Sequence, residues 1–584
     1  MIYSVSANQD SFHQVEFEPG FNLIVADTIG EPTEHAERTR NAAGKTFLVA
    51  IIHFLLGAGH SKSEVVRPEL EAWEFSMELD VGAGRVEVSR SVERPSVVSF
   101  DGPHEDWPVV PQLNGDTERY ELRLADWTRV LGAGMFSLED AVDPETKNRP
   151  TFRGLVPYFA RYKNGAFQTP FKYFSTQQVV QVQVANTFLL GLNWEDAVEW
   201  QRIKDRRDGI KKLRKAVQKG ALGAALASRG RLEARKVTLD RQIASGQEQL
   251  AAFQVHEQYD EIGAEADGLT SAIHELTNAN VIRRRKVTLY EQHLADEAEP
   301  DMSEVLGLYE EASVSLGDAV VNDFEAVSEF HRRVISNRQE YLSSEVAALT
   351  NEIAEASQEV EELSERRAAL MGVLRTHGAL EEFVGLQNRL AGLQEESAEV
   401  TAALQQLQAV EAGEGEVNAD EQALRERARQ DLEERRPEWE AAIAQFAENT
   451  GTLYSEPGAL VIDIGNAGFE FDYDIDGKGS RGVTNVVIFS YDLMLAQRWS
   501  AEEHSPGFLL HDSEIFDGVD ERQIAGALML ASTQAAEHGF QYICSLNSDD
   551  LPSPDFLTGL DLTETRRLQL TDETDEGRLL GIAF

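Results

Sequence analysis

The residues best suited to bind a ligand lie at positions 41–47. They are Asn41, Ala42, Ala43, Gly44, Lys45, Thr46 and Phe47. A glycine followed by a lysine and a hydroxyl residue is typical of a phosphate-binding loop. In such a loop the amides face phosphate oxygens, the lysine reaches the outer phosphates and the hydroxyl ligates Mg²⁺. Thr39 stands where the motif has its first glycine. The stretch predicts a site for the phosphates of a nucleotide with Mg²⁺.

The segments around this loop are those that a phosphate site requires. Apolar residues at 21–26 predict a buried strand, and the apolar residues at 47–56 predict a buried helix that ends at Gly57. A polar stretch at 27–40 separates the strand from the loop. A helix that begins beside Lys45 directs the positive end of its dipole toward bound phosphates. The flanking strand and helix therefore strengthen the prediction.

A phosphate-binding loop also needs a carboxylate on the metal side, and this residue normally follows an apolar strand. Residues 508–511 predict such a strand, and Asp512 comes directly after it. We therefore expect Asp512 to face Thr46 across Mg²⁺. The alternative is an aspartate that only caps the following helix. Another apolar strand, at 541–546, ends at Asn547.

Composition excludes several classes of protein. The 584 residues exceed what one hydrophobic core holds, so two or more units are expected. A net charge of −47 repels nucleic acid at long range, so any DNA contact must come from local basic clusters. The single cysteine, Cys544, excludes an intrachain disulfide framework. No apolar run approaches the roughly 20 residues of a membrane helix, and residues 1–5 read as a strand instead of a leader. We expect a cytoplasmic protein with no membrane contact.

The hydrophobic pattern changes character along the chain. Alternating strands at 12–17, 75–79 and 85–90 give way to a stretch rich in Glu, Gln, Ala, Leu and Arg, and α/β character with a hairpin returns near the end. We predict an N-terminal lobe, a first arm, an arm tip, a returning arm and a C-terminal lobe, at 1–195, 196–300, 301–338, 339–450 and 451–584.

Heptad spacing supports the arm. Apolar residues recur at a and d positions in two registers, at 346–370 and at 386–407, and more weakly at 232–250. We expect an antiparallel hairpin of two long helices with its tip near 300–335. Each helix, at about 1.5 Å per residue, reaches on the order of 100 Å. The alternative is a compact domain of long helices. In the hairpin, the two lobes must meet at its base.

The order of these parts resembles the head of an ABC-type ATPase of the SMC and RecN group. Ser480 and Gly482 look like that family's signature, Asp512 like its Walker B aspartate and Asp520 like its D-loop aspartate, while Asn547 lies at the position of its switch residue. The resemblance implies an α/β fold, a two-lobed P-loop ATPase head with a long antiparallel coiled-coil arm inserted. It also implies ATP and Mg²⁺ between the heads of a homodimer, with the signature acting on the partner's nucleotide.

Within that group the chain most resembles the YydD-like ATPases of bacterial ABC-three-component systems. The resemblance rests on Asp512 with Ser513, on residues 516–520 and 541–543, and on the tip residues 330–333 and 337–338. It implies a role in defence against phages or plasmids, with a separate effector protein as partner. A RecN-like repair ATPase and a nucleotide-switched structural tether remain alternatives.

Two features depart from the family pattern. Ser513 occupies the place of the glutamate that orients the attacking water, and Glu514 follows one position later. Since phosphoryl transfer depends on positioning, a group displaced by one residue slows turnover. Glu514 and Asp517 are the candidates for this role, weak or absent hydrolysis is the alternative, and Asn547 stands where relatives have histidine. Which of Gln168, Gln177 and Gln178 links Mg²⁺ to the lobes stays open.

A dense basic run marks the beginning of the first arm. Its central members are Arg206, Arg207, Lys211, Lys212, Arg214 and Lys215. The resemblance implies that DNA is clamped at this place, and phosphate contacts need such a cluster. The alternative is a helix face that pairs with the glutamates of the returning arm.

Overall fold

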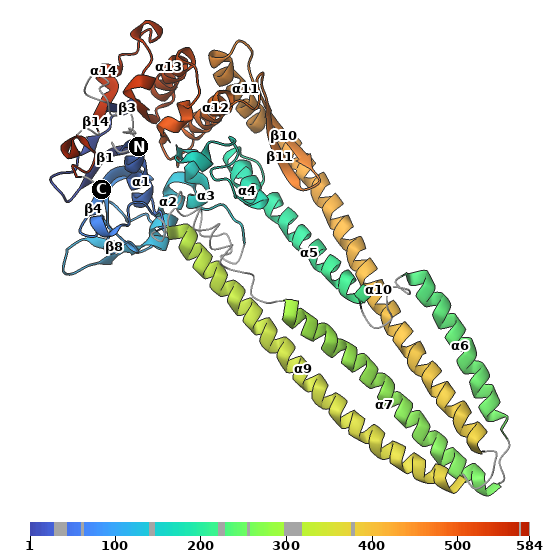
Figure 1. The fold of residues 1–584 in the computed structure, drawn as a ribbon. Helices are drawn as coiled ribbons and strands as arrows, with labels where there is room; N and C mark the ends of the chain where they lie inside the picture. The colour runs from blue at the N-terminus through green and yellow to red at the C-terminus, as the bar shows by residue number, and fades with distance from the viewer. Residues whose placement is uncertain are drawn as a thin grey trace, which may run out of the picture. The chain divides into compact units, whose positions relative to one another are not determined.

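The computed structural model describes residues 1–27, 44–59, 63–138, 147–219, 228–253, 257–296, 318–374, 380–571 and 574–582 (Figure 1). Asn41, Ala42 and Ala43 of the predicted loop therefore lie outside the described residues. The fold is mixed α/β with long helices, and it divides into two compact units. One unit comprises Met1–Gln201 and Ala423–Phe584 with the start of α9, and the other comprises Arg202–Pro300 and Glu329–Gln422.

A parallel sheet forms the centre of the first unit. Among the described residues it has five strands in the order β14, β3, β13, β12 and β9. They are Arg566–Thr571, Phe21–Asp27, Gln541–Asn547, Phe508–His511 and Ala160–Arg161. All neighbouring pairs are parallel. The strand before Gly44 and the strand before Asp512 thus lie in one sheet, and their carboxyl ends share one edge, where open parallel sheets bind ligands.

Strands β3, β13 and β12 are buried along almost their whole length, so both faces of the sheet are covered there. Helices α12 (Arg481–Trp499) and α13 (Glu521–His538) pack into the same core. That core includes Leu23, Leu509 and Tyr542. The first and last parts of the chain therefore build one core, as expected if two predicted lobes meet.

An antiparallel sheet holds most of the N-terminal strands. In the described residues its order is β2, β1, β4, β5, β6, β8 and β7. The strands are Val15–Glu16, Ile2–Ala7, Glu74–Val81, Gly84–Ser91, Val97–Asp101, Tyr120–Arg123 and Gln112–Leu113. The strand predicted at 12–17 is only the short β2. Helix α1 (Lys45–Leu55) contacts strands of both sheets, and α2 (Leu124–Phe136) packs on this one.

Smaller elements complete the first unit. Helices α3, α4, α11 and α14 span Phe152–Leu155, Val179–Leu189, Arg436–Leu453 and Leu562–Thr565. The hairpin predicted where α/β character returns near the end is confirmed: β10 (Ala459–Gly465) pairs with β11 (Gly468–Asp474), with Gly465 opposite Gly468. Short 3₁₀ turns occur at Pro68–Leu70, Val156–Tyr158, Asn164–Ala166, Ser513–Phe516, Ser548–Asp550, Pro554–Phe556 and Asp575–Gly577.

Long helices make up the second unit. They are most of α5 (Trp194–Lys219), α6 (Arg229–Ala251), α7 (Glu257–Asp296), and most of α9 (Asp318–Leu374) and α10 (Leu380–Glu434). Leu232 and Leu239 of α6 pack against Val400, Leu404 and Leu407 of α10. Helices α7 and α9 lie side by side (Figure 1), joined by Arg283 to Glu352 at 2.8 Å and Arg366 to Glu265 at 2.8 Å. These are the antiparallel pairs that a hairpin predicts.

Helix α7 has a second neighbour that the heptads did not predict. Gln387 of α10 donates to Asp267, and Arg285 donates to the carbonyl oxygen of Glu399 at 2.8 Å. Helix α7 therefore contacts both α9 and α10, whereas the heptads predicted a hairpin of two long helices. Heptads show which helix face is apolar but not how many helices meet it. Residues 301–317 of the predicted tip lie outside the described residues, and 318–338 belong to α9.

No helix in the part of the chain that the structure describes is long and apolar enough to cross a membrane.

Candidate functional site

Gly44 places the start of α1 at the ligand edge of the parallel sheet. Its φ of 98° lies in the left-handed region that favours glycine. A side-chain Cβ at this position would lie 2.7 Å from Cβ of Leu579, so the space also requires glycine. Lys45 and Thr46 follow in the first turn of α1. Their side chains are therefore carried by a helix N-terminus, as phosphate binding requires.

The opposite end of α1 is held by buried donors. Arg90 donates to the carbonyl oxygen of Ala58 at 2.7 Å, Arg153 to that of Leu56 at 2.9 Å, and Trp127 to that of Leu55 at 2.9 Å. Both arginines are fully buried. Positive charge at a helix C-terminus stabilises the dipole and satisfies the last carbonyls. These contacts fix the direction in which α1 presents Lys45 and Thr46.

Thr46 and Asp512 meet at the sheet edge. The Thr46 hydroxyl donates to Oδ2 of Asp512 at 2.9 Å. The other carboxylate oxygen, Oδ1, accepts hydrogen bonds from the Ser513 amide at 2.8 Å and the Ser545 hydroxyl at 2.9 Å. Asp512 therefore both caps the short 3₁₀ turn that follows it and contacts the first turn of α1. Its side chain is buried, with 1% exposure.

Asn547 lies beside the lysine of the loop. Nζ of Lys45 donates to Oδ1 of Asn547, and the Asn547 amide donates to Asp550 at 2.6 Å. The strand order brings the two together because β13 is the neighbour of β3. Lys45, Thr46, Asp512 and Asn547, predicted from distant parts of the sequence, thus form one cluster.

Glu514 combines partial burial with a crowded negative charge. Burial, followed by the negative charges of Asp512 and Asp517, raises the pKa of Glu514 to about 7, against the opposing charge of Arg481. Its Oε2 is buried and has no hydrogen-bond partner among the described residues. A carboxyl group with a pKa near neutrality is suited to take a proton from water at pH 7. Of the two candidates for this role, Asp517 is the more exposed, and it pairs with Arg481 at 2.5 Å.

The beginning of α12 is packed onto the loop after Asp512. Ser480 caps the helix by accepting from the Val483 amide at 3.3 Å. A Cβ on Gly482 would lie 2.2 Å from the carbonyl oxygen of Gly518, so only glycine fits. The buried Asn485 donates to the carbonyl oxygens of Glu514 and Asp517, each at 3.0 Å. Sequence reasoning missed Asn485, although an asparagine inside the apolar run 483–489 was a signal.

Other predicted residues lie outside this cluster of contacts. Asp520 is exposed and caps α13 by accepting from the Arg522 amide at 3.0 Å. Gln177 is buried and accepts from the Tyr173 amide at 3.2 Å, while Gln178 caps α4. Gln168 is exposed, and its side chain makes neither a helix cap nor a hydrogen bond of this kind among the described residues.

Within the second unit, the arginines and the lysines of the basic run have different contacts. Arg206, Arg207 and Arg214 form ion pairs with Asp420, Glu421 and Glu414 of α10. Lys211 lies 3.8 Å from Asp208, and Lys212 and Lys215 are exposed with no ion pair among the described residues. The arginines join helices, as the alternative held, and the lysines face solvent.

The oxygen atoms at the cluster fit Mg²⁺ that arrives with phosphates. Mg²⁺ is usually bound by one or two carboxylates together with substrate phosphates and water. Thr46 and Asp512 supply a hydroxyl and a carboxylate at 2.9 Å from each other. No group of three or more His, Cys, Asp or Glu side chains forms a metal site in the described ranges. A metal at this edge would therefore take its remaining ligands from a phosphate compound and from water.

Comparisons with known proteins match part or all of the chain. Residues 449–584 match the family described as "Uncharacterised protein conserved in bacteria (DUF2326)". A search of curated proteins finds no match. Among solved structures, the Smc head domain with a coiled coil and joint from Pyrococcus yayanosii has a TM-score of 0.34 at 14% identity, covering 99% of this chain and 96% of that one. The Smc head domain from Pyrococcus furiosus, bound to the C-terminal domain of ScpA, has a TM-score of 0.30 at 11% identity, covering 94% and 90%. Because both TM-scores are below 0.5, the function of this chain must be inferred from its own residues.

Proposed function

We propose that the chain is an ATPase that binds ATP with Mg²⁺ at the carboxyl edge of its parallel sheet and hydrolyses it slowly. The contact of Thr46 with Asp512 at 2.9 Å carries this proposal. It joins the first turn of α1, which follows the loop, to the carboxylate at the end of β12, as in a phosphate-binding loop. Thr46 and Asp512 would hold Mg²⁺, whose charge offsets that of the phosphates.

The other residues of the cluster have separate roles in this proposal. Lys45 offsets the charge of the outer phosphates and exchanges its contact with Asn547 for them. Glu514 accepts the proton of the attacking water, since its pKa of about 7 suits a general base at neutral pH. The Asn485 side chain donates to the carbonyl oxygen of Glu514 and so fixes the backbone at that residue.

We further propose that two copies bind ATP between them. Ser480 is exposed at the N-terminus of the 19-residue helix α12, where backbone amides and the helix dipole favour a phosphate of the partner copy. The exposed Lys211, Lys212 and Lys215 supply a surface for DNA phosphates. By its resemblance to YydD-like ATPases, the chain controls a separate effector in defence against phages or plasmids.

A second candidate function is a nucleotide-switched tether that binds ATP without useful turnover. One observation favours it: Ser513 directly follows Asp512, and because a serine has a hydroxyl and no carboxylate, this position offers no base. The two functions differ in turnover but share the binding site.

The experiment is an ATP-binding titration with and without Mg²⁺, followed by hydrolysis assays with no DNA, circular DNA and linear DNA. Lys45→Ala should lose ATP binding because the positive charge of Lys45 offsets that of the outer phosphates. Lys478→Ala is the control, because Lys478 pairs with Asp472 in the β10–β11 hairpin at 2.7 Å. Unchanged ATP affinity in Lys45→Ala contradicts the proposed site, whereas binding without turnover favours the tether. Stimulation by linear DNA alone favours the RecN-like alternative.

A further inference from the structure

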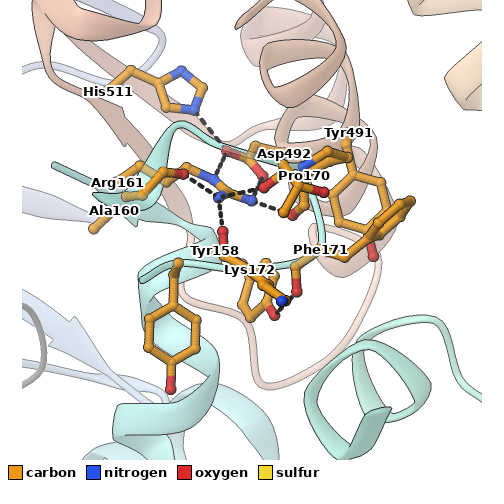
Figure 2. A network of polar contacts seen from close by, with 12 residues as sticks. Tyr158, Ala160, Arg161, Pro170, Phe171, Lys172, Tyr491, Asp492 and His511 are labelled. Carbon is orange, nitrogen blue, oxygen red and sulfur yellow. Dashed lines mark hydrogen bonds and ion pairs between the residues drawn. The ribbon is translucent and has the colours of Figure 1, made fainter. Parts of the chain in front are cut away.

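A fully buried ion pair lies at the strand end that carries Asp512. The side chains of Arg161 on β9 and Asp492 on α12 have 0% exposure. Arg161 Nε donates to Asp492 Oδ2 at 2.5 Å, and its Nη2 donates to Oδ1 at 2.9 Å (Figure 2). His511, the residue before Asp512, reaches the same carboxylate with Nε2 at 3.2 Å. One buried carboxylate thus joins β9, α12 and β12.

Arg161 also contacts the backbone of the proposed metal ligand. Strand β9 runs parallel to β12 with Arg161 opposite His511. The amide of Asp512 donates to the carbonyl oxygen of Arg161 at 3.3 Å. Arg161 therefore reaches Asp512 by two routes, one through the backbone and one through Asp492 and His511.

The remaining donors of Arg161 hold the chain segment 166–172. Nη1 donates to the carbonyl oxygen of Ala166 at 2.7 Å. Figure 2 shows the contacts with Lys172, whose carbonyl oxygen accepts from Nη1 at 2.6 Å, and with Pro170, whose carbonyl oxygen accepts from Nη2. The Tyr158 hydroxyl donates to the next carbonyl, that of Phe171, at 2.6 Å. This segment contains the exposed Gln168, and its backbone is bound on both sides of that residue.

Two hydrogen-bond partners hold the buried ring of His511, one at each ring nitrogen. A proton on Nε2 donates to Asp492 and leaves Nδ1 to accept from the Tyr542 hydroxyl at 3.3 Å. Both ring nitrogens then have partners, and the orientation of His511 is determined.

Stability alone does not explain such a network. Replacing a buried ion pair by apolar residues of similar volume is often neutral or stabilising. We propose that Arg161, Asp492 and His511 are positioning residues that fix Asp512 in one arrangement for metal binding. The inference rests on the proposed function. It corresponds to the general role of outer partners that orient metal ligands.

The test measures metal binding without requiring turnover. Mn²⁺ is titrated into the full chain with ATP and followed by electron paramagnetic resonance, and ATP affinity is measured separately in EDTA. Arg161→Lys keeps the charge but loses the planar fork. The double variant Arg161→Met with Asp492→Leu removes the pair in a form that can fold, as shown by its thermal unfolding. We expect Mn²⁺ affinity to fall about 10- to 100-fold in both, with metal-free ATP affinity unchanged.

Arg427→Lys is the control, because Arg427 also pairs with a fully buried aspartate, although its own side chain is 60% exposed. Arg427 contacts Asp196, whose side chain also has 0% exposure, at 2.5 Å, but this pair joins α10 to α5. Its Mn²⁺ affinity should equal that of the wild type. Should either Arg161 variant bind Mn²⁺ and ATP as the wild type does, the network is structural only and the inference is wrong. A wild type that binds no ATP overturns the proposed function and this inference with it.

Discussion

Thr46 and Asp512 are 466 positions apart in the sequence, yet the Thr46 hydroxyl donates to the Asp512 carboxylate at 2.9 Å. The parallel sheet makes this contact, because β3 and β12 each pair with β13 and end at the same edge. Lys45 and Asn547 meet at that edge as well. The cluster therefore depends on the beginning and the end of the chain folding together.

Glu514 should give the hydrolysis rate its pH dependence. Its pKa of about 7 means that the base is protonated in acid, so the rate should rise as the pH increases through about 7. Glu514→Gln should keep ATP binding, lose about 10²-fold in rate and lose this inflection. Steady-state hydrolysis between pH 5.5 and 8.5 checks it.

The control for this measurement is Glu448→Gln, an exposed glutamate on α11. If Glu514→Gln hydrolyses ATP like the wild type, Glu514 is not the base, and Asp517→Asn is the next variant to measure. Full activity in both would leave ATP binding as the functional event.

Asn485 should matter more for turnover than for binding. Asn485→Asp places a carboxylate against the carbonyl oxygens of Glu514 and Asp517, which its amide now contacts at 3.0 Å. We expect hydrolysis to fall while ATP affinity with Mg²⁺ is kept, at a stability cost of about 1–3 kcal/mol. Calorimetric unfolding and hydrolysis rates measure the two effects.

Asn449→Asp is the comparison, since Asn449 is equally buried and donates to the Ser490 carbonyl oxygen at 3.2 Å. It should unfold at a lower temperature yet hydrolyse ATP normally. Equal loss of turnover in both variants would show a general packing effect instead of a specific role for Asn485.

ATP should drive dimerisation through the exposed end of α12. Glu514→Gln with ATP and Mg²⁺ should have twice the monomer mass in light scattering. Adding Ser480→Asp keeps a good helix cap but brings a negative charge to the partner's phosphates, so it should abolish the dimer. Ser480→Asn, an equally good and neutral cap, should preserve it. Dimers that survive Ser480→Asp would show that this surface does not meet the nucleotide.

Mutation of the lysines and of the arginines in the basic run should have different effects, the first on DNA binding and the second on stability. Lys211, Lys212 and Lys215 changed together to Glu should weaken DNA binding for every sequence and lower the log–log salt slope by about one unit per lost phosphate contact. Arg206, Arg207 and Arg214 changed to Gln should instead lower the unfolding temperature, because they pair with α10. Fluorescence anisotropy at several salt concentrations measures the first effect. Wild-type protein without DNA affinity at low salt would leave the whole run as a helix-pairing surface.

The sequence was informative where one local pattern determines the outcome. Apolar runs at 21–26, 508–511 and 541–546 predicted strands β3, β12 and β13. Asp512 was expected opposite Thr46 because a phosphate-binding loop needs a carboxylate that follows an apolar strand. Ser480 was singled out by its resemblance to the family's signature, and it caps α12. The strands needed only neighbouring residues, whereas Asp512 and Ser480 needed a motif known from other proteins.

Other features depend on contacts that no local pattern contains. Arg161 belongs to a two-residue strand, and its partners are Asp492 and four carbonyl oxygens of the following segment. The polar residues Asn485 and Ser545 interrupt apolar runs, which marks them as unusual but does not name their partners. The contact of α7 with α10 could not be predicted, because the apolar spacing along a helix does not indicate how many helices pack against it.

The most direct test of the central claim is a crystal structure with a non-hydrolysable ATP analogue and Mg²⁺. We predict phosphates at the N-terminus of α1 with Lys45 turned from Asn547 toward them. Mg²⁺ should be ligated by the Thr46 hydroxyl and held by Asp512 directly or through water. A nucleotide bound elsewhere, or a metal that contacts neither Thr46 nor Asp512, would contradict the proposed site.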